Sequence, residues 1–132
     1  MKKMIVFSSL LTIVAVIGIV VLLRNNGTST AAVASTPSNV SVVGGKQVIQ
    51  IDAKGGYVPR NTVAKANMPT TLNVKTNGTF DCSSGLSIPS LGYRTNLPPS
   101  GVTPIEIPPQ PAGTTLKGVC AMGMYNFAVN FN

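Results

Sequence analysis

The 132-residue chain contains no histidine and no tryptophan, and it has only three acidic residues. Without imidazole, the chain lacks the two histidines of a blue-copper site and the general base of a Ser–His or Cys–His nucleophile. The acids are Asp52, Asp81 and Glu106, and no two of them form a pair suited to acid–base catalysis. A glycine-rich phosphate-binding loop is also missing. From these absences we expect that the protein is not an enzyme.

Positive charge is in excess, but it is not clustered. The net charge is +7, and from Asn25 onward seven basic and three acidic residues leave a net charge of +4. The seven basic residues form no run: Lys46, Lys54, Arg60, Lys65, Lys75, Arg94 and Lys117. A nucleic-acid interface usually needs a clustered basic face. We therefore predict an ordinary solvated surface and no nucleic-acid partner.

The first 24 residues are expected to form a membrane anchor. Residues 5–23 contain no charged side chain, and 19 residues in a helix span about 28 Å, close to the ~30 Å hydrocarbon core of a bilayer. A cleaved secretory signal is the alternative, because Ala32-Val33-Ala34 resembles a cleavage site. The apolar run is longer than a usual signal core, which favours the anchor.

Charges beside this segment predict its orientation. Lys2 and Lys3 precede the apolar run, whereas Arg24 stands alone after it until Lys46. The positive-inside rule then places the N-terminus in the cytoplasm and the following domain outside the cell membrane. Residues 25–45, rich in Ser, Thr, Asn, Ala and Gly, are expected to be a flexible linker. The folded domain is expected over residues 46–132.

The domain shows the pattern of a small all-β protein. In residues 47–53, Ile49, Ile51 and Ala53 alternate with Gln50 and Asp52, as in a half-buried strand. Further short strands are expected between Pro- and Gly-rich breaks, over residues 62–66, 69–76, 86–88, 94–97, 102–107, 116–120 and 126–131. About eight strands at this spacing predict a Greek-key β-sandwich or barrel.

Four sulfur side chains form the candidate site: Cys82, Cys120, Met122 and Met124. The last three alternate, so they share one face if the segment is extended. If the segment is a loop, Gly123 lets it curl around an ion. Thiolate and thioether are soft ligands that select Cu(I), whereas zinc rarely accepts thioether. The pattern favours a site for one or two Cu(I) ions.

The two cysteines also allow a purely structural interpretation. In an exported domain a cysteine pair is often a disulfide, and methionines often fill gaps in a core. Only three methionines follow residue 46, namely Met68, Met122 and Met124, and two of them adjoin Cys120. Spacing alone leaves the disulfide and the metal site equally open.

Several motifs follow one another in a fixed order after Gly55. They are Gly56-Tyr57-Val58-Pro59, Cys82, Leu86-Ser87-Ile88-Pro89, Leu91-Gly92, Leu97-Pro98, Ile105-Glu106, Pro108, Pro111-Ala112-Gly113 and Cys120-Ala121-Met122-Gly123-Met124-Tyr125. In these motifs the chain resembles the cupredoxin-like domains of bacterial membrane-anchored Cu(I)-binding proteins, the CupA-type copper chaperones. The resemblance implies a cupredoxin-like Greek-key β-sandwich after one transmembrane helix, with Cys82, Cys120, Met122 and Met124 as Cu(I) ligands that can hold a dinuclear cluster.

Two functions follow as hypotheses. The favoured one is a membrane-tethered Cu(I) chaperone or buffer in copper resistance, which passes copper by ligand exchange to a partner such as a copper-transporting P-type ATPase. To load a cytosolic domain of such an ATPase, the copper-binding domain must face the cytoplasm, whereas the charges place it outside. A cytoplasm-facing domain therefore stays an alternative. The second hypothesis is an extracytoplasmic interaction module stapled by a Cys82–Cys120 disulfide.

Overall fold

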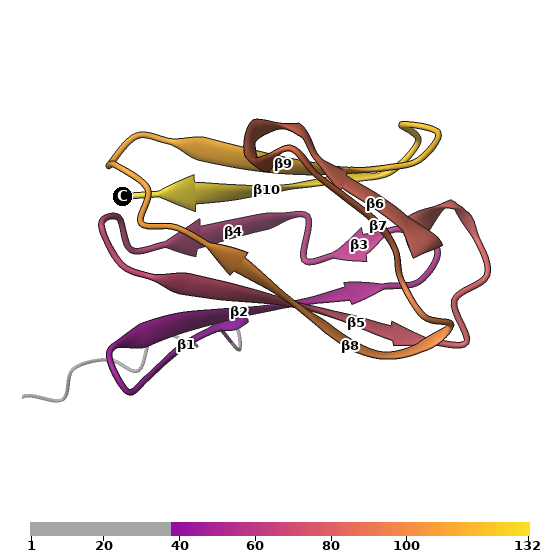
Figure 1. The fold of residues 1–132 in the computed structure, drawn as a ribbon, viewed down its shortest axis with the longest axis horizontal. Helices are drawn as coiled ribbons and strands as arrows, with labels where there is room; N and C mark the ends of the chain where they lie inside the picture. The colour runs from indigo at the N-terminus through magenta and orange to yellow at the C-terminus, as the bar shows by residue number, and fades with distance from the viewer. Residues whose placement is uncertain (1–37) are drawn as a thin grey trace, which may run out of the picture. The chain divides into compact units, whose positions relative to one another are not determined.

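The computed structural model of the chain describes residues 38–132, which form two β-sheets around a shared core (Figure 1). The first sheet has the order β1-β2-β5-β8, with β3 also paired to β2, and the second has the order β4-β10-β9-β6-β7. The strands are β1 (Val40–Val43), β2 (Lys46–Ala53), β3 (Tyr57–Val58), β4 (Asn61–Ala64), β5 (Thr70–Asn77), β6 (Gly85–Ile88), β7 (Tyr93–Asn96), β8 (Ser100–Ile107), β9 (Thr115–Cys120) and β10 (Asn126–Phe131). The expected all-β sandwich is confirmed.

Alternating burial shows why these segments are strands. Ile49, Ile51 and Ala53 of β2 are buried while Gln50 and Asp52 are exposed, as predicted. The same two-residue period buries one face of β5 and one face of β10. The inward side chains of both sheets form one core. β2, β5 and β10 therefore each contribute one buried face to the interior of the sandwich.

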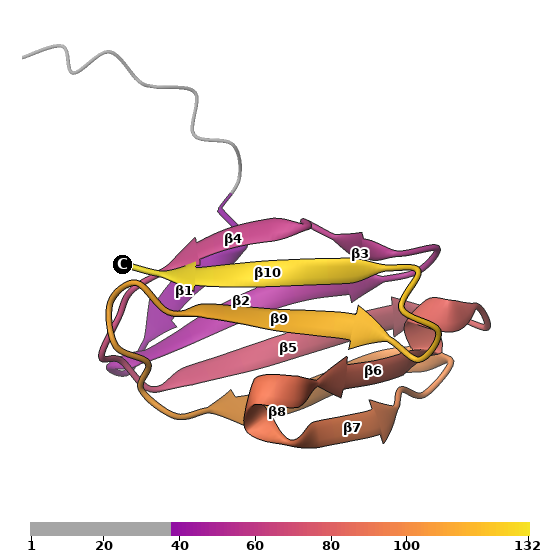
Figure 2. The same cartoon turned by 90° about the horizontal axis from the view of Figure 1, so that it is seen from above.

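The chain passes repeatedly from one sheet to the other. β2 pairs with β5 in parallel, and β4 pairs with β10 in parallel, so strands distant in sequence lie side by side. Figure 2 looks onto the second sheet, with β10 beside β9 in front and β2 and β5 of the first sheet behind. Two single-turn 3-10 helices, η1 (Cys82–Ser84) and η2 (Pro89–Leu91), flank β6. Residues 38–132 contain no α-helix.

Two short strands were not expected from the sequence. β1 lies inside the stretch predicted to be a linker, and it pairs antiparallel with β2. Three of its four residues are exposed, so no apolar period marks it. β3 has only two residues and follows the Gly55-Gly56 turn. In both places hydrogen bonding to β2 forms a strand that apolar patterning does not reveal.

The predicted anchor (residues 1–24) and most of the predicted linker lie outside the described residues. Within residues 38–132, no helix has the length and hydropathy needed to cross a bilayer. The transmembrane helix stays a prediction.

Candidate metal centre

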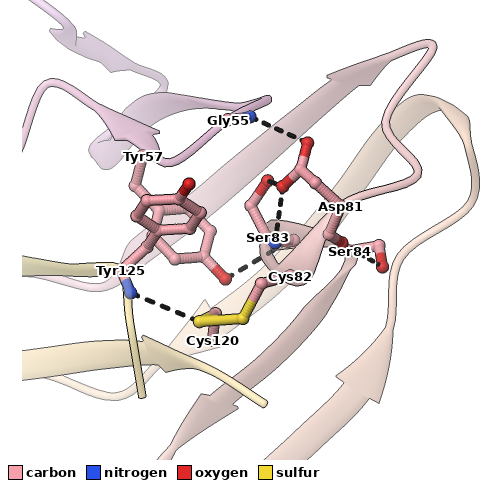
Figure 3. The surroundings of a disulfide bond; sticks show 8 residues. All are labelled: Gly55, Tyr57, Asp81, Cys82, Ser83, Ser84, Cys120 and Tyr125. Carbon is pink, nitrogen blue, oxygen red and sulfur yellow. Dashed lines mark hydrogen bonds between the residues drawn. A yellow bond between two sulfur atoms is a disulfide. The ribbon is translucent and has the colours of Figure 1, made fainter. Parts of the chain in front are cut away.

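Cys82 and Cys120 meet at one end of the sandwich and form a disulfide bond (Figure 3). Cys82 begins η1, and Cys120 is the last residue of β9. Their Cα atoms are 5.7 Å apart although 38 positions separate them in the sequence. Cys120 is 2% exposed, and Cys82 is half-buried against the core. The fold thus brings together the two cysteines that the sequence offered both as a disulfide and as copper ligands.

Asp81 fixes the turn that carries Cys82. Its carboxylate accepts hydrogen bonds from the backbone N–H of Ser83 (2.8 Å), from the Ser83 hydroxyl, and from the backbone N–H of Gly55 (2.9 Å). An aspartate that accepts from the residue two positions ahead is a typical cap for the start of a helical turn. The bond to Gly55 also ties η1 to the turn between β2 and β3. Because three donors stabilise the charged form, with Ser83 the strongest, the pKa of Asp81 lies below its ordinary value.

Tyr57 binds the same turn from the core side. Its ring is 1% exposed, and its hydroxyl donates a hydrogen bond to the Ser83 carbonyl at 3.2 Å. Its ring packs edge-to-face on Phe127, with centroids 5.2 Å apart. Burial, and secondarily the charge of Asp81, raise the pKa of Tyr57 to about 12. Tyr57 is therefore a neutral hydrogen-bond donor at physiological pH.

The turn between β9 and β10 carries the second cysteine. The Cys120 N–H donates to the Tyr125 carbonyl at 2.9 Å, and the Gly123 N–H donates to the Cys120 carbonyl at 2.9 Å. The Tyr125 N–H in turn points at the Cys120 sulfur, 3.3 Å away (Figure 3). Gly123 has φ +73°, a left-handed conformation that glycine adopts without steric cost. Residues 120–125 therefore form a closed turn. Of the two conformations considered for this segment, the structure has the loop and not the extended strand.

Met122 and Met124 lie on this turn with most of their surface in solvent. They are 72% and 65% exposed, in contrast to Cys120, which is 2% exposed and belongs to the core. The structure therefore joins the two cysteines and leaves the two thioethers at the adjoining surface. Among residues 38–132, no three His, Cys, Asp or Glu side chains cluster as metal ligands, so a site with three or more ligands here would need methionine sulfur.

A close aromatic contact underlies the second cysteine. Gly118, two residues before Cys120, lies opposite Phe127 in the β9–β10 ladder. A Cβ atom at Gly118 would lie only 2.2 Å from the Phe127 ring. Glycine at this position makes room for the ring that Tyr57 also contacts. Phe127 therefore contacts both Tyr57, which binds the turn of Cys82, and Gly118, which lies on the strand that ends in Cys120.

The sulfur residues could be named from the sequence, but the residues that hold the two cysteines in place could not. The Asp81–Ser83 cap has a local signal, because an aspartate side chain often bonds to the backbone two residues further on in a turn. The contacts of Asp81 with Gly55 and of Tyr57 with Ser83 each span 26 residues. No periodicity or local motif reports contacts over such a distance.

Comparisons with known proteins agree with this architecture. A family model described as "Cupredoxin-like domain" matches residues 13–129. A copper binding protein solved by NMR in its apo form is 25% identical, with a TM-score of 0.64, and the match covers 70% of this chain and 94% of that one.

The metal binding domain of the Cu(I) exporting P-type ATPase CopA from Streptococcus pneumoniae D39, crystallised with Cu(I), is 20% identical. Its TM-score is 0.63, and the match covers 72% of this chain and 94% of that domain. This second likeness concerns the fold alone. Among curated proteins, none matches the chain.

Proposed function

This chain belongs to the family of cupredoxin-like domains, and from that premise we propose that it is a Cu(I)-binding protein, a chaperone or buffer in copper resistance. Reduced Cys82 and Cys120 hold the ion as thiolates, and Met122 and Met124 add thioether ligands. Together they bind one or two Cu(I) ions. Similarity to a solved copper binding protein supports the proposal.

The observation that carries the proposal is the meeting of Cys82 and Cys120 beside the methionine turn. Two sulfurs close enough to form a bond are close enough to ligate one small ion once the bond is reduced. Cu(I) prefers such soft donors and accepts low coordination numbers. The exposed thioethers suit release, because a partner's thiolates can approach from solvent and replace them one at a time.

An anaerobic Cu(I) titration of the reduced protein against a competing chelator tests the proposal. We expect Cys82→Ser or Cys120→Ser to abolish tight binding. We expect Met122→Leu combined with Met124→Leu to lower the stoichiometry or affinity only. Met68→Leu is the matched control, since Met68 lies in the turn before β5, away from Cys120 in sequence. Unchanged Cu(I) affinity in the cysteine variants would refute the proposal, and X-ray absorption reads the sulfur ligation directly.

A second function is favoured by the disulfide itself. In this alternative the domain is an extracytoplasmic β-sandwich interaction module, and the Cys82–Cys120 bond is a permanent staple. Alkylating the cells before lysis and counting the modified cysteines separates the two. Unmodified cysteines and no copper uptake after mild reduction favour the module, whereas modified cysteines favour the copper-binding function.

The location and partner belong to the same proposal. We expect the N-terminal segment to tether the domain to the cell membrane, with the domain outside the cytoplasm by the charge rule. A copper-transporting P-type ATPase is the expected acceptor, and a cytoplasm-facing domain is the alternative. A reporter fused after Asn132 that is active only outside the cytoplasm distinguishes the two orientations.

A further inference from the structure

We propose that the reduced domain also converts Cu(II) to Cu(I): Cys82 and Cys120 supply the electrons by closing their disulfide, and Met122 and Met124 retain the product. This inference rests on the proposed copper site, but it concerns a different event. Binding takes up copper that is already monovalent, whereas this reaction takes up the divalent ion. The reaction is stoichiometric, one round per reduced chain.

The positions of the two cysteines fit both redox states. The backbone around each cysteine is held by hydrogen bonds that do not involve the sulfur atom. The turn of Cys82 is held by Asp81 and by the Leu97 N–H, which donates to the Ser84 carbonyl at 2.7 Å. Cys120 is held by its pairing with Leu86 and by the Tyr125 carbonyl. After reduction the thiols would still face each other, so the disulfide can close again without a rearrangement of the fold.

The exposure pattern sets the order of contact. An ion that approaches from solvent meets Met122 and Met124, which are 72% and 65% exposed, before it reaches Cys120, which is 2% exposed. Cys82 is half-buried and lies between these two extremes. The electron donors are thus shielded, and the groups that prefer the reduced ion are at the surface.

The surrounding donors do not stabilise Cu(II). That ion favours nitrogen and oxygen ligands, and the chain has no histidine. Asp81 precedes Cys82 in the sequence. One of its carboxylate oxygens already accepts a hydrogen bond from Gly55 and the other from Ser83. Glu106 is paired with Lys46 and Thr71 on the first sheet. Sulfur ligation therefore favours the monovalent product.

The step balances as follows. Two Cu(II) ions each accept one electron, the two thiols lose two protons and two electrons, and one sulfur–sulfur bond forms between Cys82 and Cys120. The products are two Cu(I) ions, two protons released to solvent, and the disulfide form of the domain. The Cu(II) ion is the oxidant, and no other reactant is consumed.

The test mixes the full chain, reduced and freed of reductant under argon, with two equivalents of Cu(II) sulfate. We expect the Cu(II) electron paramagnetic resonance signal to vanish and a Cu(I)-specific chromogenic chelator to recover two Cu(I) per chain. Both thiols should be lost, and the product should be monomeric on a non-reducing gel. A persistent Cu(II) signal, or Cu(I) formed without loss of thiols, would overturn the inference.

Variants separate reduction from retention. The variant with both Met122→Leu and Met124→Leu should still reduce Cu(II), but its Cu(I) should pass into the filtrate on rapid desalting, whereas the wild type keeps it. Equal retention by the two proteins would overturn the role of the thioethers. Cys82→Ser, whose remaining thiol is the buried Cys120, should reduce at most one Cu(II) per chain. Full two-electron reduction by this variant would overturn the role of the cysteine pair.

Direct titration with Cu(I) distinguishes the two proposals. A reduced protein that binds Cu(I) tightly but leaves Cu(II) unreduced supports the proposed function and overturns this inference. A protein that reduces Cu(II) with closure of the disulfide, but whose reduced form has no affinity for Cu(I), supports the electron transfer and overturns the binding function.

Discussion

Single polar side chains hold the cysteine-bearing turn in place. The carboxylate of Asp81 joins η1 to the Gly55 turn, and the hydroxyl of Tyr57 joins η1 to the core. The first contact starts from the side chain that precedes Cys82, and the second ends on the carbonyl of Ser83, which follows it. The position of this sulfur therefore depends on residues that have no metal-binding role in the proposed site.

Tyr57 gives a prediction for alkaline pH. Its pKa is raised from 10.0 to about 12 in the folded protein. Between these values the unfolded chain releases the phenol proton and the folded protein keeps it, so the free energy of unfolding falls as the pH rises above 10. At neutral pH, Tyr57→Phe should cost about 1 kcal/mol for the lost hydrogen bond.

Denaturant titrations at pH 8 and pH 11 measure both effects. The Tyr57→Phe variant should lose less stability between the two pH values than the wild type does. Tyr93→Phe, at a half-buried position on β7, is the control. An equal loss in wild type and Tyr57→Phe would contradict the assignment.

At the scale of the elements, β9 and β10 form the antiparallel hairpin that carries Cys120. Gly118 of β9 and Phe127 of β10 are direct partners in the ladder. The ring occupies the space above the glycine. The strand that ends in Cys120 therefore has one position, Gly118, where a side chain larger than hydrogen would clash with the Phe127 ring.

Gly118→Ala should destabilise the domain by roughly 1–3 kcal/mol or more, because overpacking forces the Phe127 ring or the strand to move. Thermal unfolding measures the loss. Lys117→Ala, an exposed change on the same strand, is the control and should stay within about 0.5 kcal/mol of the wild type. Adding Phe127→Leu to Gly118→Ala should relieve part of the clash. A Gly118→Ala protein as stable as Lys117→Ala would refute this packing account.

The elements also show what patterning can and cannot predict. The alternating burial of β2, β5 and β10 was predictable because one face of each strand is apolar. β1 was missed because Val42 and Val43 are exposed, and β3 because two residues cannot display a period. The four sulfur positions were predicted as a site from residue type and spacing, and the structure joins two of them in a disulfide. Their different exposures, and the supports at Asp81 and Tyr57, depend on contacts across the sandwich that the sequence does not encode locally.

At the scale of the whole molecule, the Cys82–Cys120 bond closes a long loop through both sheets. The bond spans 38 positions and joins η1 to the end of β9. The segment between them includes β6, β7 and β8. The redox state of one cysteine pair therefore affects the stability of the entire domain.

Reduction should lower the free energy of unfolding by about 4 kcal/mol in the chain-entropy model for a loop of this length. Thermal melts of the oxidised and reduced protein measure the difference. Cu(I) added to the reduced protein should restore stability by an amount that rises with the logarithm of the ratio of free Cu(I) to its Kd, because only the folded state gathers the ligands. A protein with both Cys82→Ser and Cys120→Ser should melt like the reduced wild type and should not respond to Cu(I). A Cu(I)-induced rise in its melting temperature would contradict ligation by these cysteines.

The parallel pairing of β4 with β10 has a consequence for biosynthesis. Asn61 lies beside Ala128, so the partner of β4 leaves the ribosome long after β4 itself. Until residues 126–131 emerge, β4 keeps an open edge and Cys120 lacks the neighbouring strand of its hairpin. The pairing around Cys120 is therefore completed late in translation, and a nascent chain stalled before β10 would expose an unpaired strand to the machinery of protein quality control.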